Sequence, residues 1–302
     1  MKVNVMKINL LTLVIFIMLS PSTQAQDSFD LVVMDTKSFM GNYSIVPGSA
    51  KMLTDREGYD NQPFFINNKQ VVFSSQDDQN NNDIILYSFD KDDFTNMTRT
   101  PDLSEFSPRL TDCGTYISAV TVETDSSQRL WLYPINFGEP ELLYDDIEPV
   151  GYYDWYDNKA AMYVLGEPNT LIYPQSREEI IPIASNVGRS IQRRPKTSQI
   201  TYIDKETSVS LNGINTFQIK FYDLKDNSEG TYGTTLGEED DFIWLDKNTL
   251  LMAQGQDLYI KKVNKTTEWT KIAKVSMPGY GKISRLAASP KLDRLVLVME
   301  RK

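Results

Sequence analysis

The sequence comprises 302 residues, of which 40% are hydrophobic and 24% are charged, and it carries a formal net charge of −10 at pH 7. An acidic chain repels phosphate backbones and anionic lipid surfaces, so nucleic-acid binding is not expected. The chain has no histidine and one cysteine, Cys113, which excludes histidine-dependent catalytic triads, imidazole or thiolate-cluster metal sites and an intrachain disulfide.

Catalysis or metal binding by this chain would have to use the oxygen and nitrogen atoms of other side chains. An enzyme built on this chain would depend on carboxylates, tyrosines or lysines. A metal, if one binds, would be a hard cation held by oxygen atoms, with calcium as the first candidate. The composition is that of a soluble globular protein with enough apolar residues for a full core.

The chain begins with a pattern typical of a secretory signal peptide. Lys2 and Lys7 supply positive charge, a short apolar run covers residues 8–19, and small residues follow at the usual cleavage spacing. We therefore predict that residues 1–25 are a signal peptide and that residues 26–302 form the mature, periplasmic or secreted domain. The alternative is an uncleaved anchor, for which the apolar run is short.

Beyond residue 26, apolar segments with the composition of β-strands follow one another along the chain. Two of them, FDLVVMDT at 29–36 and SAKMLTD at 49–55, stand alone before a pattern that recurs six times. In each copy, two anchors seven residues apart, apolar except for Arg193 in the fourth copy, flank a polar turn. The six anchor pairs are Phe65/Val72, Leu110/Ile117, Trp155/Met162, Arg193/Ile200, Trp244/Leu251 and Ala288/Leu295.

The spacing of these copies, mostly in the mid-forties, is typical of the four-stranded blade of a β-propeller. Each of the first five copies continues into a third apolar segment and a short fourth one, whereas the sixth stops after its second strand at Lys302. We therefore predict an all-β, six-bladed propeller that is closed by the segments at 29–36 and 49–55, which complete the last blade and remove two open sheet edges. The alternative fold is a β-sandwich.

Several short motifs of these copies resemble the propeller repeat of the TolB family, a WD-repeat-like module of bacterial envelopes. The resemblance implies a six-bladed ring over the whole mature chain, and the separate α/β domain that precedes the propeller in TolB has no counterpart in this sequence. Because the repeat occurs in exported proteins of many roles, it specifies the fold better than the function. The motifs are Pro63-Phe64-Phe65, Asn68-Lys69, Ser107-Pro108 with Asp112 and Gly114, Ser289-Pro290, and the third-strand starts Asp30-Leu31, Asp83-Ile84 and Asp257-Leu258-Tyr259.

A dense cluster of acids and amides between Asp77 and Asp83 lies in the loop between two predicted strands. A calcium loop of the EF-hand type needs glycine at its sixth position and glutamate at its twelfth, and counts from Asp77 and from Asp78 both fail this test. We favour a solvated turn, and a weak calcium site is the alternative. No cofactor is expected, and calcium is not expected to be required for folding.

Three acids precede the first strands of their blades by equal offsets. Asp60, Glu105 and Glu239 each lie five residues before an anchor, and Asp240 follows directly. Equal offsets place side chains at one height around a propeller axis, so we predict a negative channel mouth that attracts a basic or amine-bearing segment of a partner. The alternatives are a rim of solvated carboxylates and a carboxylate pair for sugar hydrolysis.

A basic cluster at the start of the fourth copy contains Arg189, Arg193, Arg194 and Lys196. It is a candidate patch for a carboxylate-bearing ligand, because arginine forks fit carboxylates. Its alternative role, which we favour, is to balance the acidic field around it.

The sequence as a whole favours an exported, non-catalytic propeller that binds a protein or peptide partner in the bacterial envelope. We expect one propeller domain and a monomer. The alternative is a hydrolase or lyase that uses channel carboxylates, with or without calcium. A third interpretation is a small-ligand binder without turnover.

Overall fold

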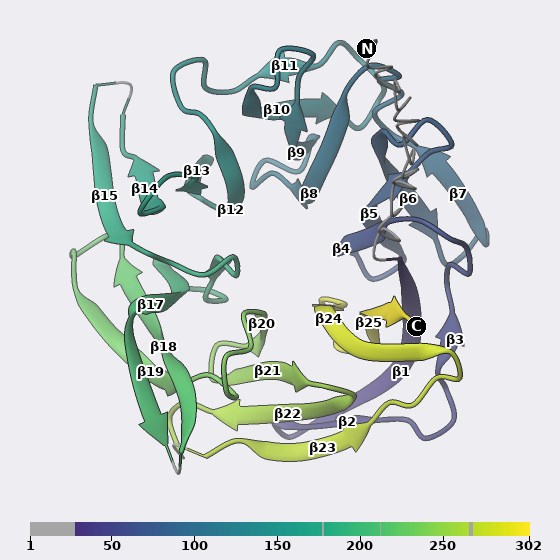
Figure 1. Cartoon of the computed structure of the whole chain (residues 1–302), viewed down its shortest axis with the longest axis vertical. Helices are drawn as coiled ribbons and strands as arrows, with labels where there is room; N and C mark the ends of the chain where they lie inside the picture. The colour runs from purple at the N-terminus through teal and green to yellow at the C-terminus, as the bar shows by residue number, and fades with distance from the viewer. Residues whose placement is uncertain (1–27, 177, 212, 266–267) are drawn as a thin grey trace, which may run out of the picture.

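The computed structural model describes residues 28–176, 178–211, 213–265 and 268–302. Within these ranges the chain forms 25 β-strands and no α-helix, and the strands make six antiparallel sheets around a central axis (Figure 1). The predicted all-β, six-bladed propeller is confirmed. None of the described residues belongs to a helix that could cross a membrane. The predicted signal peptide at 1–25 lies outside the described residues.

Five blades are continuous in sequence, and their four strands run outward from the axis in chain order. Blade one contains β4 (Asp60–Asn67), β5 (Gln70–Gln76), β6 (Asn82–Ser88) and β7 (Asp93–Asn96); blade two contains β8 (Ser104–Leu110), β9 (Tyr116–Val122), β10 (Gln128–Pro134) and β11 (Glu141–Leu142). Blade three contains β12 (Val150–Tyr156), β13 (Lys159–Val164), β14 (Thr170–Pro174) and β15 (Ile180–Ser185). Blade four contains β16 (Gln192–Arg193), β17 (Gln199–Leu211), β18 (Ile214–Asp223) and β19 (Glu229–Thr234); blade five contains β20 (Phe242–Asp246), β21 (Thr249–Gln254), β22 (Asp257–Lys262) and β23 (Thr270–Lys274).

The second strand of each blade forms the core of the ring. It is flanked by strands on both edges and by neighbouring blades on both faces, so it needs a nearly continuous apolar run. The second anchor of each of the six copies is fully buried, with 0% of its surface exposed. These six anchors are Val72, Ile117, Met162, Ile200, Leu251 and Leu295.

Buried tryptophans join neighbouring blades at two junctions. The indole N–H of Trp155 in blade three donates to the hydroxyl of Ser118 in blade two at 2.9 Å, and that of Trp244 in blade five donates to the hydroxyl of Thr201 in blade four at 2.9 Å. Both tryptophans are first anchors of their copies. They combine apolar packing with a satisfied polar N–H, as buried tryptophan requires.

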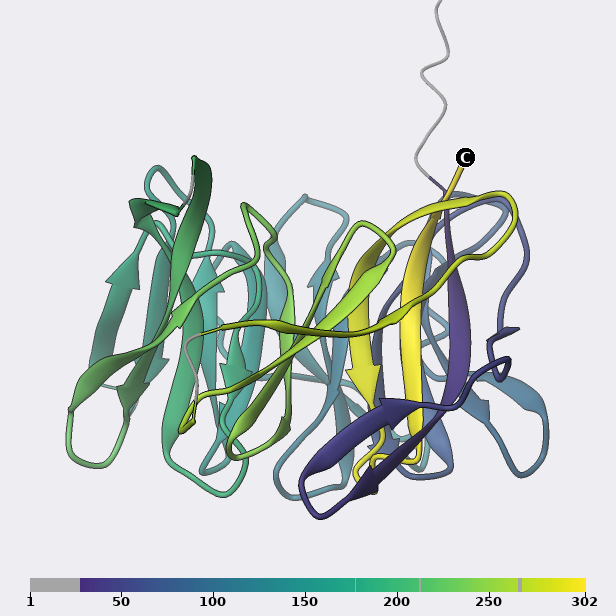
Figure 2. The same ribbon diagram turned by 90° about the horizontal axis from the view of Figure 1, so that it is seen from below.

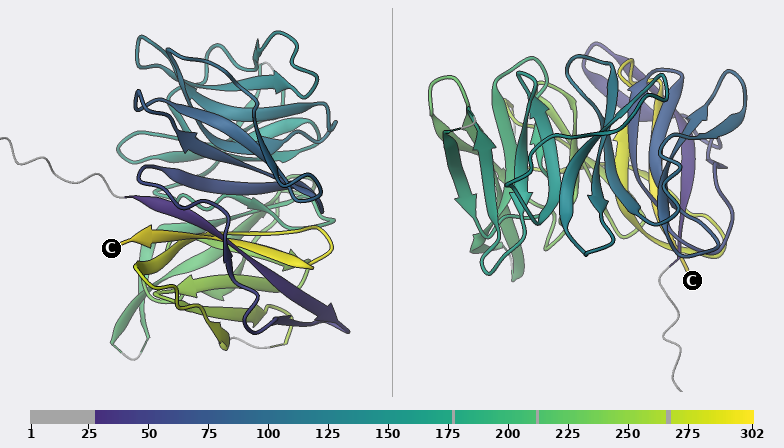
Figure 3. Two further views of the ribbon diagram at one scale, coloured as in Figure 1. Left: turned by 90° about the vertical axis from the view of Figure 1, so that its right-hand side faces the viewer. Right: turned by 90° about the horizontal axis from the view of Figure 1, so that it is seen from above.

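Blade six closes the ring with strands from both ends of the chain. β24 (Tyr280–Ala288) and β25 (Arg294–Arg301) are its inner strands, and β1 (Phe29–Phe39) pairs antiparallel with β25 in a register from Phe29↔Glu300 to Asp35↔Arg294. The fourth position is shared by β3 (Lys51–Met52) and β2 (Asn42–Ile45), which pair with different halves of β1. Figure 3 shows β1, in purple, beside the yellow β25. The predicted closure of the ring is confirmed.

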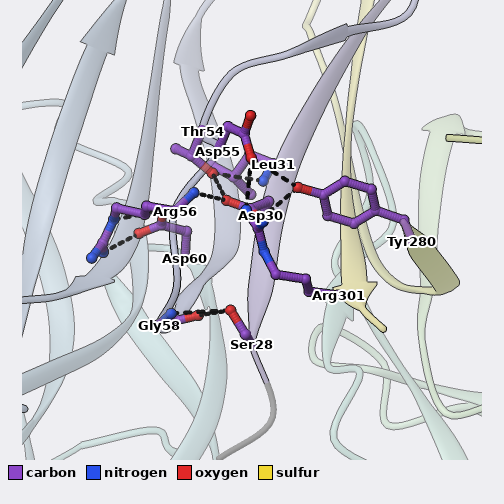
Figure 4. Close-up of polar contacts among 10 residues, drawn as sticks. All are labelled: Ser28, Asp30, Leu31, Thr54, Asp55, Arg56, Gly58, Asp60, Tyr280 and Arg301. Atoms are coloured by element: carbon purple, nitrogen blue, oxygen red, sulfur yellow. Dashed lines mark hydrogen bonds and ion pairs between the residues drawn. The ribbon is translucent and has the colours of Figure 1, made fainter. Parts of the chain in front are cut away.

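A buried carboxylate secures this closure (Figure 4). Asp30, which is 0% exposed, accepts hydrogen bonds from Arg301 at 2.5 Å, from the Tyr280 hydroxyl at 2.8 Å and from the Thr54 hydroxyl at 3.1 Å. It also accepts the backbone N–H of Arg56 at 3.0 Å. One side chain thus joins strands from the two ends of the chain to the segment that leads into blade one.

We call the end of the ring at which the C-terminus lies the upper end; it is at the top of Figure 2. Strand direction alternates within a blade, so first and third strands begin there. The hairpin of β17 and β18 rises above the ring at this end, and the β1–β2 hairpin protrudes at the lower end (Figure 2). Both hairpins are longer than the sequence pattern predicts.

Candidate functional site

The central channel contains a cavity of about 270 Å³ to which all six blades contribute. The first strands β4, β8, β12, β20 and β24 supply most of its wall, and the segment leading into β16 supplies the rest. First strands surround the axis of a propeller, and pockets of this kind are where such folds bind ligands. The cavity is therefore the candidate site.

Two β-bulges direct polar side chains into the cavity wall. Gln62 and Ser107 occupy equivalent places in blades one and two, each directly before a proline, and both have positive φ values of 58° and 54°. The pairing of β4 with β5 and of β8 with β9 shifts register at these points. The Gln62 side chain accepts the backbone N–H of Ser107 at 2.6 Å. Strained backbone of this type is common beside functional sites.

Three arginines from different blades line the cavity. Arg109 lies 3.5 Å from the carboxylate of Asp154, donates to the carbonyl of Ile191 and stacks on the Phe64 ring at 5.3 Å. Its guanidinium group is therefore already engaged on several sides.

Arg285 is engaged in a similar way. It lies 3.4 Å from Asp241, donates to the Tyr152 hydroxyl at 3.2 Å and stacks on that ring at 5.2 Å. Burial raises the pKa of Asp241, and the nearby guanidinium groups of Arg285 and Arg189 act against this rise. Burial also raises the pKa of Tyr59, to about 12, with Arg285 acting in the opposite direction.

Arg189 differs from the other two arginines. It donates one hydrogen bond, to the carbonyl of Ser284 at 2.9 Å, and its Nε atom is buried without a hydrogen-bond partner among the described residues. The hydroxyl of Ser107, which lines the same cavity, is likewise buried and unpartnered there. Buried polar atoms are rarely left unsatisfied, so these two groups are available to a ligand or to water.

Asp60 and Glu105 lie at the upper ends of their blades, where the equal offsets place them, but their carboxylates are buried. Asp60 is 0% exposed and accepts hydrogen bonds from Arg56 at 2.6 Å and from Ser75 at 2.7 Å. The Asp60 carboxylate therefore stabilises the wall of the ring and is not accessible to solvent. Its role in partner binding stays a prediction.

Glu105 is also 0% exposed, and it lies between blades one and two. Its carboxyl group accepts hydrogen bonds from the hydroxyls of Thr100 at 2.7 Å and Tyr133 at 3.1 Å. Burial raises its pKa to about 7, against the effect of these hydrogen bonds and with a smaller contribution from Asp83.

The acids before blade five are more accessible than these two. Glu238 is exposed and Glu239 is half-buried, and burial raises the pKa of Glu239 while Lys282 and Arg189 lower it. Asp240 forms an ion pair with Lys205 at 2.6 Å, and its other oxygen is buried without a partner among the described residues. Position 188 must be glycine, because a Cβ atom at that position would lie 2.1 Å from this Asp240 oxygen.

The predicted basic patch is distributed over three environments. Arg189 lies in the cavity, whereas Arg193 pairs with Asp112 at 3.1 Å and stacks on a tyrosine ring. Arg194 donates to the carbonyl of Lys247 at 2.6 Å and lies over the Trp244 ring at 5.5 Å. Of the three, Arg189 is the arginine placed to meet a ligand in the channel, and that role stays a prediction.

The loop around Asp77 has the geometry of a turn. The carboxylate of Asp77 accepts the backbone N–H groups of Gln79 and Asn81 at 2.8 and 2.9 Å, and Asn80 has a positive φ of 66°. Side-chain caps of this kind stabilise turns. Among the described residues, no group of three or more acids or cysteines has the arrangement of a metal site, and the calcium prediction itself stays untested.

Sequence reasoning missed Arg109, Arg285 and Ser107 as cavity residues. A signal was present, because Arg109 and Arg285 interrupt first-strand segments, SPRL and ISRLAA, that are otherwise largely uncharged. An arginine inside such a strand needs a partner or a function.

No protein-family model and no curated protein matches this sequence. Solved structures match in fold, however. A protein of Agrobacterium tumefaciens described as TolB superposes with a TM-score of 0.62 at 10% identity, over 92% of this chain and 99% of that one. TolB from Acinetobacter baumannii gives a TM-score of 0.55 at 10% identity, over 90% of this chain and 63% of that one.

An oligogalacturonate lyase in complex with manganese is similar to the same degree, with a TM-score of 0.55 at 10% identity over 86% of this chain and 82% of that one. At such identities the likeness concerns the fold alone. The chain shares the six-bladed propeller fold of these TolB structures, and the resemblance read from the repeat motifs is confirmed at the level of the fold.

Proposed function

We propose that this protein is an exported, non-catalytic binding protein of the bacterial envelope that engages a protein or peptide partner at the upper end of its channel. The TolB-like propeller supports a scaffold role, and the pattern of residues 1–25 supports export to the periplasm or beyond.

The observation that carries the proposal is the raised wall beside the channel at the upper end. The β17–β18 hairpin brings Ile214, which is 57% exposed, against the loop that contains Gly237 and the exposed Glu238. Glu239 follows, and Asp241, two residues later, lines the cavity. An exposed apolar side chain beside accessible carboxylates suits a partner segment with apolar and basic residues.

The test is a pull-down of the tagged mature protein from envelope extract at low and moderate salt. Glu238→Gln combined with Glu239→Gln should reduce capture of the partner, because it removes the accessible carboxylates and leaves the buried Asp60 and Glu105 intact. Capture by the wild type should itself weaken as salt rises.

The matched control is Glu178→Gln combined with Glu179→Gln. It removes two exposed charges from the loop between β14 and β15, at the lower end of the ring. The proposal fails if both double variants retain the wild-type partner set and salt dependence, or if the control loses capture equally.

A carboxylate-dependent enzyme is the second candidate, and one observation favours it. Asp241 lines the cavity, and burial raises its pKa, as a general acid requires. Oligogalacturonate, the compound named for one structural neighbour, is the first substrate to assay. Turnover by the wild type that is lost in Asp241→Asn would replace the binding proposal.

A further inference from the structure

We infer that the channel cavity is a binding site for one carboxylate group of a small molecule with an apolar body, held by Arg189 and the Ser107 hydroxyl. This inference goes beyond the proposed function, since it concerns the interior of the ring and not the partner surface at its upper end. It rests on unsatisfied donors, on a charge count and on the dimensions of the cavity.

The donors identify the anchoring groups. Arg109 and Arg285 each have a carboxylate and an aromatic ring as neighbours, whereas Arg189 has one carbonyl partner and a buried, unpartnered Nε atom among the described residues. An arginine fork with a free edge matches the two oxygens of a carboxylate. The buried hydroxyl of Ser107, in blade two, lines the same cavity and supplies a further donor.

The charges favour a ligand with a single negative charge. Three arginines face the cavity, and two of them are compensated by Asp154 and Asp241. Glu239 interacts electrostatically with both Lys282 and Arg189, and Lys282 also lies 3.6 Å from the carboxylate of Glu300. The positive and negative groups in and around the cavity are therefore close to balance, which favours a singly charged carboxylate over a phosphate, whose charge approaches two.

The walls and the volume of the cavity indicate what the rest of the ligand is like. Phe64, Trp244 and Leu286 give the cavity apolar faces. A volume of about 270 Å³ is below the usual range of drug-sized pockets. The site therefore suits a compound of the size of an acylated amino acid.

The test uses N-acetylphenylalanine and its amide, which have the same shape and differ in charge. Calorimetric titration of the full mature protein should show binding of the acid, with the amide bound at least about tenfold more weakly, because it lacks the charge-assisted hydrogen bonds. Inorganic phosphate, as the alternative anion, should bind more weakly than the acid.

Arg189→Gln should weaken binding of the acid about tenfold or more, and Ser107→Ala should weaken it by a smaller factor. Arg99→Gln is the matched control, because it removes one positive charge at an exposed position on blade one and should leave affinity unchanged. Melting temperatures of all variants establish that they are folded.

The inference is overturned if the acid does not bind at about 10 mM, if the amide binds equally well, or if Arg189→Gln leaves affinity unchanged. Phosphate binding tighter than that of the acid would overturn the carboxylate assignment. Failure of these titrations leaves the pull-down result unaffected, so the two proposals are tested separately.

Discussion

The buried carboxyl of Glu105 makes the stability of the ring depend on pH. Its folded-state pKa of about 7 lies above its ordinary value of 4.5, so between these pH values the folded protein holds a proton that the unfolded chain has lost. The stabilising effect is fully present below pH 4.5 and is lost as pH rises through 7, with a size of about 3 kcal/mol at most.

Glu105→Gln should remove this dependence, because the amide is neutral at every pH and retains an oxygen that accepts from Tyr133. Chemical unfolding at pH 5 and pH 8 should show the wild type losing more free energy of unfolding than the variant over that interval. Asp102→Asn, at an exposed position nearby, should behave like the wild type. Parallel curves for Glu105→Gln and the wild type would contradict this assignment.

At the scale of the element, a recurring link joins the third strand of a blade to the chain that leaves it. In blade one the Thr98 hydroxyl accepts the N–H of Ile84 and donates to Asp83. In blade six the Thr54 hydroxyl accepts the N–H of Leu31 and donates to Asp30. The acid at the start of the third strand, recognised in the sequence as a motif, therefore fixes the corner between blades.

Asp30→Ala should destabilise the closure strongly. It would leave Arg301 and Tyr280 without their shared acceptor, and the loss of one partner of a buried pair costs about 3–5 kcal/mol. Asp35→Ala, on the same strand but at an exposed position, should change stability by less than about 0.5 kcal/mol. Thermal or denaturant unfolding measures both, and equal stabilities would show that Asp30 does not secure the ring.

The strands were predictable because their signal is local. A buried second strand appears in the sequence as an apolar run. The sixth copy lacks its third and fourth strands, and the unmatched segments at 29–36 and 49–55 supply them, so the closure could also be predicted. The β17–β18 extension was missed because its residues, ETSVS at 206–210, lack an apolar run.

The candidate site was less predictable because the residues that contact one another there are distant in sequence. Asp60 and Glu105 were expected just before their first strands and lie instead within the first two residues of β4 and β8. Their burial involves Arg56, Thr100 and Tyr133, which no spacing rule connects to them. The cavity joins arginines from blades two, four and six, and only the closed ring brings them together.

At the scale of the whole molecule, the ring has two different ends. The upper end has the β17–β18 hairpin with Ile214 and the accessible acids, and the lower end has the β1–β2 hairpin with Phe39 and Met40, which are 73% and 86% exposed. Each hairpin carries an exposed apolar side chain, so the two tips form a matched pair for locating a partner.

Photocross-linking from these two tips tests the central claim, that the partner binds at the upper end of the ring. A photoreactive phenylalanine analogue is placed at position 214 in one protein and at position 39 in another, since both side chains are exposed and replacement leaves the core intact. After irradiation in envelope extract, our account predicts a discrete adduct from position 214, weakened by salt, and none from position 39. Adducts from position 39 alone, or equally from both positions, would contradict it.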